Sequence, residues 1–217
     1  MENKNGFDNF DIIYIINLKH RTDRWEQIML EMSKMNIDSN KIVRIDGVYA
    51  DFGILGCTMA HYNTIKHFIN TPDNINNCIV FEDDFEFTQD KETVNELINQ
   101  FFNNNINYDI LLLSSNIYGE QSTNYDFITK IYDAQTTSSY CVNKNFAPIL
   151  LNNFNEAVQK LSLSYDKING THNWHYSIDI HWKLLQPMNN WYCLKPKIGQ
   201  QRLSYSDIEK RDVNYKC

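Results

Sequence analysis

The chain has 217 residues, which is enough for one domain with a well-buried core and short for two. A hydrophobic content of 42%, with 13 Tyr, 12 Phe and 4 Trp, indicates a folded globular protein and excludes a disordered chain. The formal net charge of −7, without a long basic stripe, makes nucleic acid an unsuitable partner.

The first half of the chain alternates short apolar runs with amphipathic segments. Residues 11–18 are apolar and β-branched, as in a strand buried on both faces. A helix is predicted over 21–35, a second strand over 41–45 and a second helix over 57–69. The apolar strand predicted at 78–81 runs directly into three acids. This order is typical of strand–helix–strand units.

The second half continues the alternation less regularly. We predict a helix over 91–102, strands over 108–113 and 138–142, and a helix over 146–161. The tail from Asn173 has no clear period. Together the elements predict a single α/β domain over residues 1–217, with a mostly parallel central sheet flanked by helices.

The first residues of the sequence and its cysteines indicate in which cellular compartment the protein is expected. The first ten residues are polar, and the apolar run that follows is too short for a signal core or a membrane span. The five cysteines are widely spaced, form no CxxC pair and are Cys57, Cys78, Cys141, Cys193 and Cys217. We therefore expect no membrane span and a reducing, cytoplasmic location.

The acidic triplet Glu82-Asp83-Asp84 is the main candidate for chemistry. It has apolar residues on both sides, so we expect it at the carboxyl end of a buried strand, where open α/β sheets bind ligands. Adjacent carboxylates repel one another unless a cation neutralises them, and Mg²⁺ or Mn²⁺ prefers such oxygen ligands. The alternative is a solvated turn after a strand.

Three segments, in order, resemble glycosyltransferase family 25, the lipopolysaccharide-modifying and collagen glycosyltransferases. Residues 14–25 are similar to the opening strand with its NLxxRxDR continuation, and Ile79 to Asp84 to the hydrophobic-EDD metal motif. Between them, Asp46-Gly47 and residues 53–61 are similar to a DG pair followed by GxxGCxxSH, although Ala60 replaces the serine.

Weaker similarity continues at residues 137–144 and 205–208, whereas 113–132 shows no family pattern. The resemblance implies a GT-A-like fold, Mn²⁺ (or Mg²⁺), a UDP-sugar donor and an inverting transfer to a hydroxyl of a glycan or protein acceptor. It also implies a nucleotide-sugar half at about 10–115 and an acceptor half at about 116–217.

The resemblance further implies which residues bind the donor. These are Asn17, Leu18, Arg21, Arg24, Asp46, Gly53, His61, Glu82 and Asp83. Helix-start arginines and backbone amides suit a diphosphate. The alternatives are a solvated arginine pair with Asp23, a plain loop at Gly53, and a core histidine satisfied by hydrogen bonds at His61.

The metal ligands expected from the family are Asp84 and Glu82. By analogy with enzymes of this fold, which complete the shell from the C-terminal part, His181 is the third candidate. Asp179 is the candidate base that removes the proton of the acceptor hydroxyl; a helix-capping or ion-paired aspartate is the alternative. Trp174, Tyr176 and Trp182 could stack on a sugar or on uracil, or pack in the core.

Two other functions compete with glycosyl transfer. A nucleotidyltransferase would carry a glycine-rich phosphate loop with a lysine near the first strand, and residues 18–21 contain no glycine. A non-catalytic domain that binds a glycan or a nucleotide sugar stays open, although the intact acidic triplet argues against it. Metal-dependent UDP binding would separate the leading hypothesis from this alternative.

Overall fold

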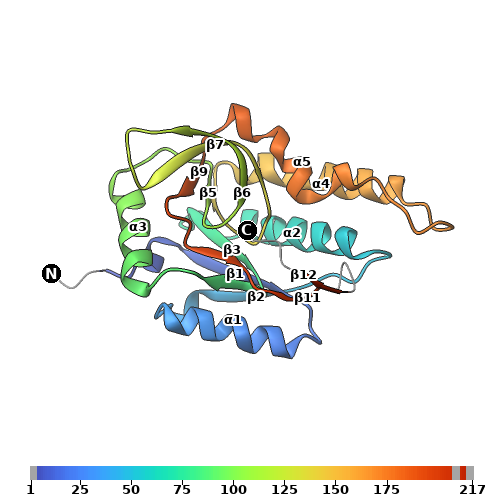
Figure 1. Cartoon of the computed structure of the whole chain (residues 1–217), viewed down its shortest axis with the longest axis horizontal. Helices are drawn as coiled ribbons and strands as arrows, with labels where there is room; N and C mark the ends of the chain where they lie inside the picture. Colours follow the sequence, from blue (N-terminus) through green and yellow to red (C-terminus); the bar gives the residue numbers. More distant parts are fainter. Residues whose placement is uncertain (1–3, 207–210, 214–217) are drawn as a thin grey trace.

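The computed structural model describes residues 4–206 and 211–213 of the chain. At its centre lies an eight-stranded mixed sheet with the strand order β2-β1-β3-β8-β5-β9-β7-β6 (Figure 1). Strands β7 and β8 run against the other strands, so the sheet is mostly parallel, as predicted. The strands are β1 (Ile12–Asn17), β2 (Ile42–Asp46), β3 (Asn77–Glu82), β5 (Ile110–Leu112), β6 (Asn116–Ser122), β7 (Ile128–Gln135), β8 (Ser139–Asn143) and β9 (Trp191–Leu194).

Helices cover both faces of the sheet, because alternate side chains of the buried strands point to opposite sides. In β1, Ile13 and Ile15 pack toward α1 and α3, whereas Tyr14 and Ile16 pack toward α2 and α4. The α-helices are α1 (Thr22–Lys34), α2 (Gly53–Ile69), α3 (Lys91–Asn103), α4 (Ala147–Ser164) and the short α5 (Ile178–His181). Short 3₁₀ turns are η1 (Gly6–Asn9), η2 (Ser39–Lys41), η3 (Trp174–Tyr176), η4 (Trp182–Leu184) and η5 (Gln186–Met188).

The predicted helices and strands are confirmed to within a few residues, with one informative exception. Helix α2 begins at Gly53 and not at Cys57. Its first turn packs on the preceding loop, where a Cβ on Gly56 would lie 2.2 Å from the Val48 carbonyl oxygen. Glycine at position 56 therefore permits the close approach that places the start of α2 beside the sheet.

The hairpin formed by β6 and β7 was not predicted from the sequence. Its strand β6 is mostly exposed, so it lacks the apolar run that marks a buried strand. Strand β8 was predicted, but its antiparallel direction between β3 and β5 was not. A strand buried on both faces has no polar alternation and so carries no signal of its direction.

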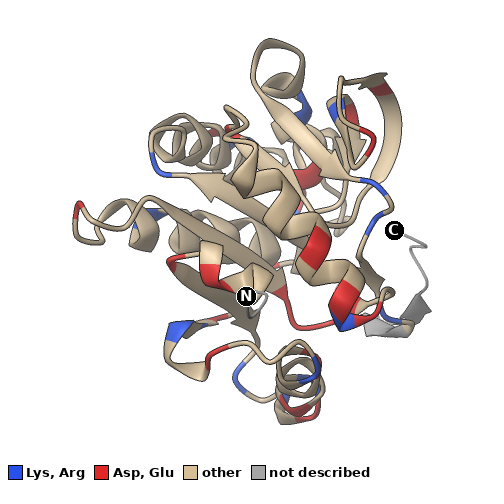
Figure 2. Cartoon of the chain, turned by 90° about the vertical axis from the view of Figure 1, so that its left-hand side faces the viewer, with Lys and Arg blue, Asp and Glu red and all other residues tan. Residues whose placement is uncertain are grey.

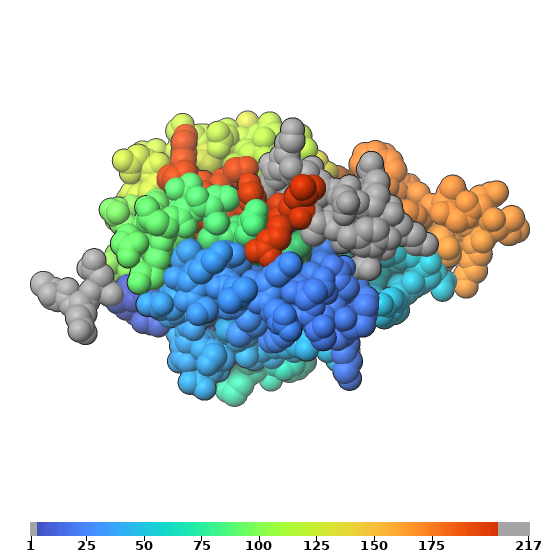
Figure 3. All heavy atoms as spheres, turned by 60° about the horizontal axis from the view of Figure 1, so that its bottom comes forward, coloured from blue at the N-terminus to red at the C-terminus, as the bar shows by residue number. Residues whose placement is uncertain are grey.

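Two small sheets complete the fold. Strand β4 (Phe85–Phe87) pairs with β10 (Gly199–Gln201), and β11 (Ser204–Ser206) pairs with β12 (Arg211–Val213). In Figure 3 the red C-terminal segment lies on the surface beside the blue α1 region and the green β4 region. Of the weak family match at 205–208, residues 207 and 208 lie outside the described part of the chain.

The expectations for membrane spans and for cysteines concern residues 4–206 and 211–213, the described part of the chain. None of their helices is both long and apolar enough to cross a membrane. Their cysteines, Cys57, Cys78, Cys141 and Cys193, are all free thiols, whereas Cys217 lies outside the described residues.

Candidate functional site

The acidic triplet lies at the carboxyl ends of two neighbouring parallel strands. Strand β3 ends at Glu82, and the register pairs Glu82 with Ile16 of β1. The next residues, Asn17 and Asp83, therefore meet at the same sheet edge, and the Asn17 Nδ2 donates to Asp83 Oδ2 at 2.6 Å. This is the edge at which open α/β sheets bind ligands.

Asp83 is held by a buried ion pair. The Nη1 of Arg24, in the first turn of α1, lies 2.9 Å from Asp83 Oδ1 and 3.4 Å from Asp84 Oδ2. The Arg24 and Asp83 side chains are only 11% and 10% exposed. Burial raises the pKa of Asp83, and the charge of Arg24 and the Asn17 bond oppose that shift. Asp83 is thus bound to protein groups on both of its oxygens.

Glu82 lies between two groups of side chains. Its Oε1 accepts hydrogen bonds from Thr137 Oγ1 at 2.7 Å and from His61 Nε2 at 3.1 Å. Its Oε2 faces the Gln201 Nε2 at 3.5 Å. Burial acts to raise the pKa of Glu82, but the His61 and Thr137 interactions outweigh it, so the pKa lies below its usual value. Glu82 is therefore ionised at neutral pH.

Asp84 has weaker partners than Asp83. Its Oδ1 lies 3.4 Å from Gln201 Nε2, at the long limit of a hydrogen bond. Burial, followed by the negative charge of Glu82, raises the pKa of Asp84 to about 7. A cation near Glu82 and Asp84 would remove this repulsion.

The C-terminal segment reaches the acids by pairing β10 with β4. The backbone N–H of Arg202 donates to the Asp84 carbonyl oxygen at 2.6 Å. The Arg202 side chain also bridges Glu86 at 3.1 Å and Glu31 at 3.0 Å. These contacts hold Gln201 against the acidic triplet.

In Figure 2 the Lys and Arg positions are spread among several elements.

The candidate base lies on the opposite side of Glu82 from Arg24's helix, on α5. Burial raises the pKa of Asp179, and the charge of Glu82 is the next cause. Burial raises the pKa of the Cys57 thiol, and the charges of Glu82 and Asp179 raise it further. Residues from α2, β3 and α5 thus share one electrostatic environment.

The structure places His181 away from these acids. Its Nε2 lies 3.5 Å from Glu156 of α4, and its carbonyl oxygen accepts from Asn153 of α4. Side chains two positions apart on a helix point in different directions, so Asp179 and His181 cannot both face Glu82. The expected third metal ligand therefore requires correction: His181 belongs to the packing of α5 on α4.

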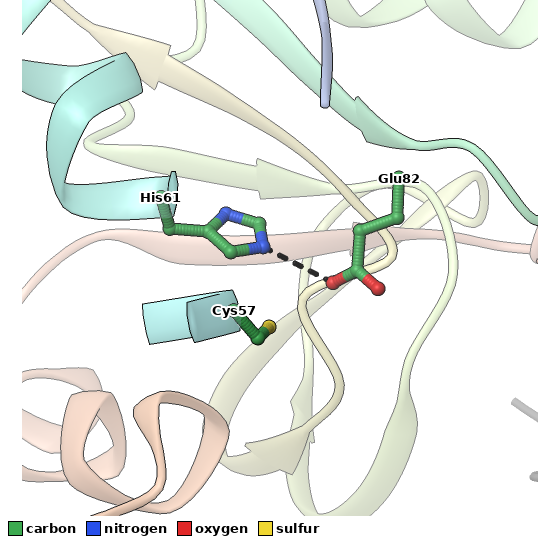
Figure 4. A group of neighbouring side chains, drawn as sticks. All are labelled: Cys57, His61 and Glu82. Atoms are coloured by element: carbon green, nitrogen blue, oxygen red, sulfur yellow. Dashed lines mark hydrogen bonds and ion pairs between the residues drawn. The ribbon is translucent and has the colours of Figure 1, made fainter. Parts of the chain in front are cut away.

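His61 is fully buried, with its Nδ1 2.8 Å from the Tyr140 hydroxyl. This arrangement matches the alternative of a satisfied core histidine, and its second nitrogen orients Glu82. Cys57, one helical turn earlier, joins the same group: its sulfur and one ligand atom each of His61 and Glu82 lie within 4.8 Å of one another (Figure 4).

The other predicted donor residues surround the end of β1. Leu18 packs on Gly47, where a Cβ would come within 2.9 Å of its side chain. Asp46 ends β2 opposite Asn17 and is exposed, and Gly53 is the first residue of α2. The Arg21 guanidinium lies 2.9 Å from Asp23, an exposed partner.

The aromatic candidates divide between core and surface. Trp182 is fully buried and packs edge-on against Trp191, whereas Trp174 is 56% exposed and stacks on His175 with ring centroids 4.0 Å apart. His172 stacks on Phe52 next to the start of α2.

Sequence reasoning missed several residues that contact the acids. Thr137 and Gln201 contact Glu82, and Tyr140 contacts His61. All three come from segments distant in the sequence from Glu82, and the weak family similarity at 137–144 did not assign a role to Thr137 or Tyr140. Arg44 was also missed: it donates to Asn17 Oδ1 and lies 4.7 Å from the Trp25 ring centroid. The i, i+4 spacing of Cys57 and His61 was the one available signal for their shared position.

No family model matches this chain. Among solved structures, the STIV protein A197 is similar, with a TM-score of 0.49 and 9% identity over 93% of this chain and 92% of that one. The mannose-1-phosphate geranyltransferase of Thermus thermophilus has a TM-score of 0.43 and 6% identity over 85% of this chain and 73% of that one. The 4-diphosphocytidyl-2C-methyl-D-erythritolsynthase of Anaerococcus prevotii has a TM-score of 0.43 and 9% identity over 86% of this chain and 73% of that one. At these values, no activity is transferred from them to this chain.

Proposed function

We propose that this protein is a metal-dependent glycosyltransferase that moves a sugar from a UDP-sugar to a hydroxyl of a glycan or protein, with inversion. One observation carries the proposal: Glu82 and Asp84 lie together at the carboxyl edge of the sheet, while Asp83 is tied to Arg24 and Asn17. The similarity of residues 14–25, 53–61 and 79–84 to glycosyltransferase family 25 supports the same function.

Glu82 and Asp84 are the residues that would hold Mn²⁺ or Mg²⁺. Both offer carboxylate oxygens, and the raised pKa of Asp84 indicates that the protein alone compensates its charge poorly. A bound divalent cation acts as a Lewis acid that neutralises charge on a diphosphate. Because His181 faces Glu156, we leave it out of this ligand set.

The diphosphate and nucleotide would bind along the end of β1 and the start of α1. The Arg24 charge is already used by Asp83, so Arg21, paired with an exposed aspartate, is the better partner for phosphate. Leu18, Asp46 and Gly53 would form the surrounding wall. His61 would act indirectly, by holding Glu82.

Asp179 would serve as the base. Burial and the charge of Glu82 raise its pKa, which makes the carboxylate a better proton acceptor. The acceptor oxygen attacks the anomeric carbon and gives its proton to Asp179, while the bond from that carbon to the β-phosphate oxygen breaks. The electron pair of that bond leaves with UDP, and attack from the opposite face inverts the anomeric centre.

We also propose that the two halves of one domain divide these tasks. Residues 10–115 supply Arg24 and the acids, and residues 116–217 supply Asp179 and an acceptor surface. Thr137 and Gln201 already reach Glu82 from the second half.

The test is a screen of UDP-sugars with Mn²⁺ that reads donor hydrolysis and thermal stabilisation. A donor at about a hundred times its Kd should add roughly 2.7 kcal/mol to the stability. Asp84→Asn should abolish turnover and metal-dependent UDP binding while the protein stays folded, and Asp179→Asn should lose turnover but keep binding.

The matched control is Glu120→Gln, which removes an exposed carboxylate on β6, and it should behave as the wild type. UDP binding without turnover on any acceptor or water would favour the non-catalytic binding domain. Unchanged turnover in Asp84→Asn would refute the metal assignment.

A further inference from the structure

A group of three different donor atoms lies on the α2 side of Glu82. Cys57 and His61 are one turn apart on α2 and so lie on the same helix face, and Glu82 reaches them from β3. The sulfur, a ring nitrogen and a carboxylate oxygen all lie within 4.8 Å of one another. In Figure 4 the three side chains point toward one another.

We propose that Cys57, His61 and Glu82 form a binding site for Zn²⁺ or a similar borderline cation, beside the site for a hard cation at Asp84. Sulfur, imidazole nitrogen and carboxylate oxygen together suit Zn²⁺, whereas Mn²⁺ and Mg²⁺ favour oxygen alone. Three protein ligands leave a fourth position open for water or another ligand.

The partners of His61 fit a metal ligand. Its Nε2, the nitrogen nearest Glu82, would bind the cation, and its Nδ1 lies 2.8 Å from the buried Tyr140 hydroxyl. A cation would replace the hydrogen bond between His61 Nε2 and Glu82, and because a hydroxyl can donate or accept, Tyr140 can then accept from a protonated Nδ1 and leave Nε2 free to coordinate. Outer partners of this kind fix the ring and increase metal affinity.

The surrounding charge also favours a cation. Glu82, Asp179, Asp84 and Asp83 all act electrostatically on the Cys57 thiol. Their negative potential disfavours an isolated thiolate but stabilises a divalent cation that the thiolate binds.

The two oxygens of Glu82 face the two sites. Oε1 lies toward His61 and Oε2 lies toward Gln201, which also contacts Asp84. Zinc on Oε1 would draw Glu82 toward α2 and weaken its hold on a cation at Asp84. Zinc would therefore inhibit the transferase, a consequence that rests on the proposed function.

Binding is tested on the full chain without any sugar donor. Co²⁺, a spectroscopic substitute for Zn²⁺, should give a thiolate-to-cobalt charge-transfer band that saturates at one thiolate-bound ion per chain, and Zn²⁺ should remove the band. Cys57→Ser should lose the band and weaken Zn²⁺ binding by at least about 100-fold, more than the roughly 10–100-fold typical of an outer partner. Tyr140→Phe should weaken binding by about 10-fold and keep the band.

Cys193→Ser is the matched control, because Cys193 is buried in β9 and is not part of this group. It should bind Co²⁺ with the same band as the wild type. A wild-type protein that binds neither ion, or a band that survives in Cys57→Ser, would overturn the site.

The inhibitory consequence needs a separate measurement. With excess Mn²⁺, added Zn²⁺ should lower UDP-sugar turnover in the wild type, and Cys57→Ser should need at least about 100-fold more Zn²⁺ for the same effect. Equal sensitivity of the two proteins would overturn the inhibition. A cobalt–thiolate band in a protein without any transferase activity would keep the site and refute the proposed function.

Discussion

Within the acidic triplet, the side chain facing α1 and the side chains facing Gln201 differ in how completely their charges are paired. On one side, Asp83 is bound through both oxygens, to Arg24 and to Asn17. On the other side, Glu82 is bound to Thr137 and His61 through Oε1 only. Its Oε2 and Asp84 share long contacts to the Gln201 amide, and the pKa of Asp84 is raised to about 7.

Under the proposed function, the difference separates a structural role for Asp83 from a ligand-binding role for Glu82 and Asp84. A buried carboxylate with ionic and amide partners links β1, β3 and α1, depends on those partners in the folded state and has little left for a ligand. Two neighbouring carboxylates without a cationic partner of similar strength favour binding of a cation from solution. Four substitutions test this distinction.

The largest effect should come from Arg24→Met. It leaves Asp83 buried without its cationic partner, which should lower the free energy of unfolding by about 3–5 kcal/mol. Urea titration measures the loss. Lys160→Met, which breaks the half-exposed pair with Glu156 at 3.5 Å, is the control and should cost about 0.5 kcal/mol or less. Equal losses would show that the Arg24 pair has no special structural role.

Asp84→Asn should change the pH dependence of stability in metal-free protein. The folded-state pKa of about 7 exceeds the ordinary value of 3.8, so the folded protein holds this proton more tightly than the unfolded chain. Stability from the protonated group is complete below about pH 4 and is lost as the pH rises to about 7. Over that window the wild type should lose up to about 4 kcal/mol relative to the variant. Parallel stability curves from pH 4 to 7 would contradict this assignment.

Thr137→Val should have an intermediate effect. It removes the 2.7 Å hydrogen bond to Glu82, and bonds to charged groups contribute about 1.5–3 kcal/mol. Thr129→Val removes a bond to the neutral carbonyl of Gln121 at 3.0 Å and should cost about 1 kcal/mol. Thermal unfolding of both variants measures the difference. A smaller loss for Thr137 than for Thr129 would mean that Glu82 is uncharged in the folded protein.

Gln201→Ala removes long contacts to Asp84 and Glu82, at 3.4 and 3.5 Å, and the loss of these two contacts should cost less than about 1 kcal/mol, the smallest of the four effects. Removal of the amide should raise Mn²⁺ affinity by about two- to five-fold, since the cation no longer displaces those bonds. Calorimetric titration with Mn²⁺ measures this change. Weaker binding in the variant would instead make Gln201 a metal ligand through its carbonyl oxygen.

Much of the framework could be predicted because its signals are local. The apolar run at 11–18 and the run that ends at Phe81 are continuous and β-branched, so both strands were found. The acids directly after the second strand had to lie at its carboxyl end. The exposed hairpin of β6 and β7 had no comparable signal.

The pairing of the acids was a matter of tertiary structure. The family resemblance assigned Glu82 and Asp84 to the metal and Asp83 to the donor, but adjacent carboxylates look alike in one dimension and the sequence does not show their partners. Contacts with Arg24, Thr137 and Gln201, up to 119 residues away, made them different. His181 shows the same limit, since the orientation of α5 on α4 turned it toward Glu156.

The sequence by itself therefore determined the strands, the helices and the place of the acidic triplet, because these follow from local patterns of apolar and charged residues. Only the tertiary structure decided which carboxylate is neutralised by an arginine of the protein and which carboxylates have weaker partners. That choice depends on burial and on partners brought together across the sheet, and neither is encoded in any single segment of the chain.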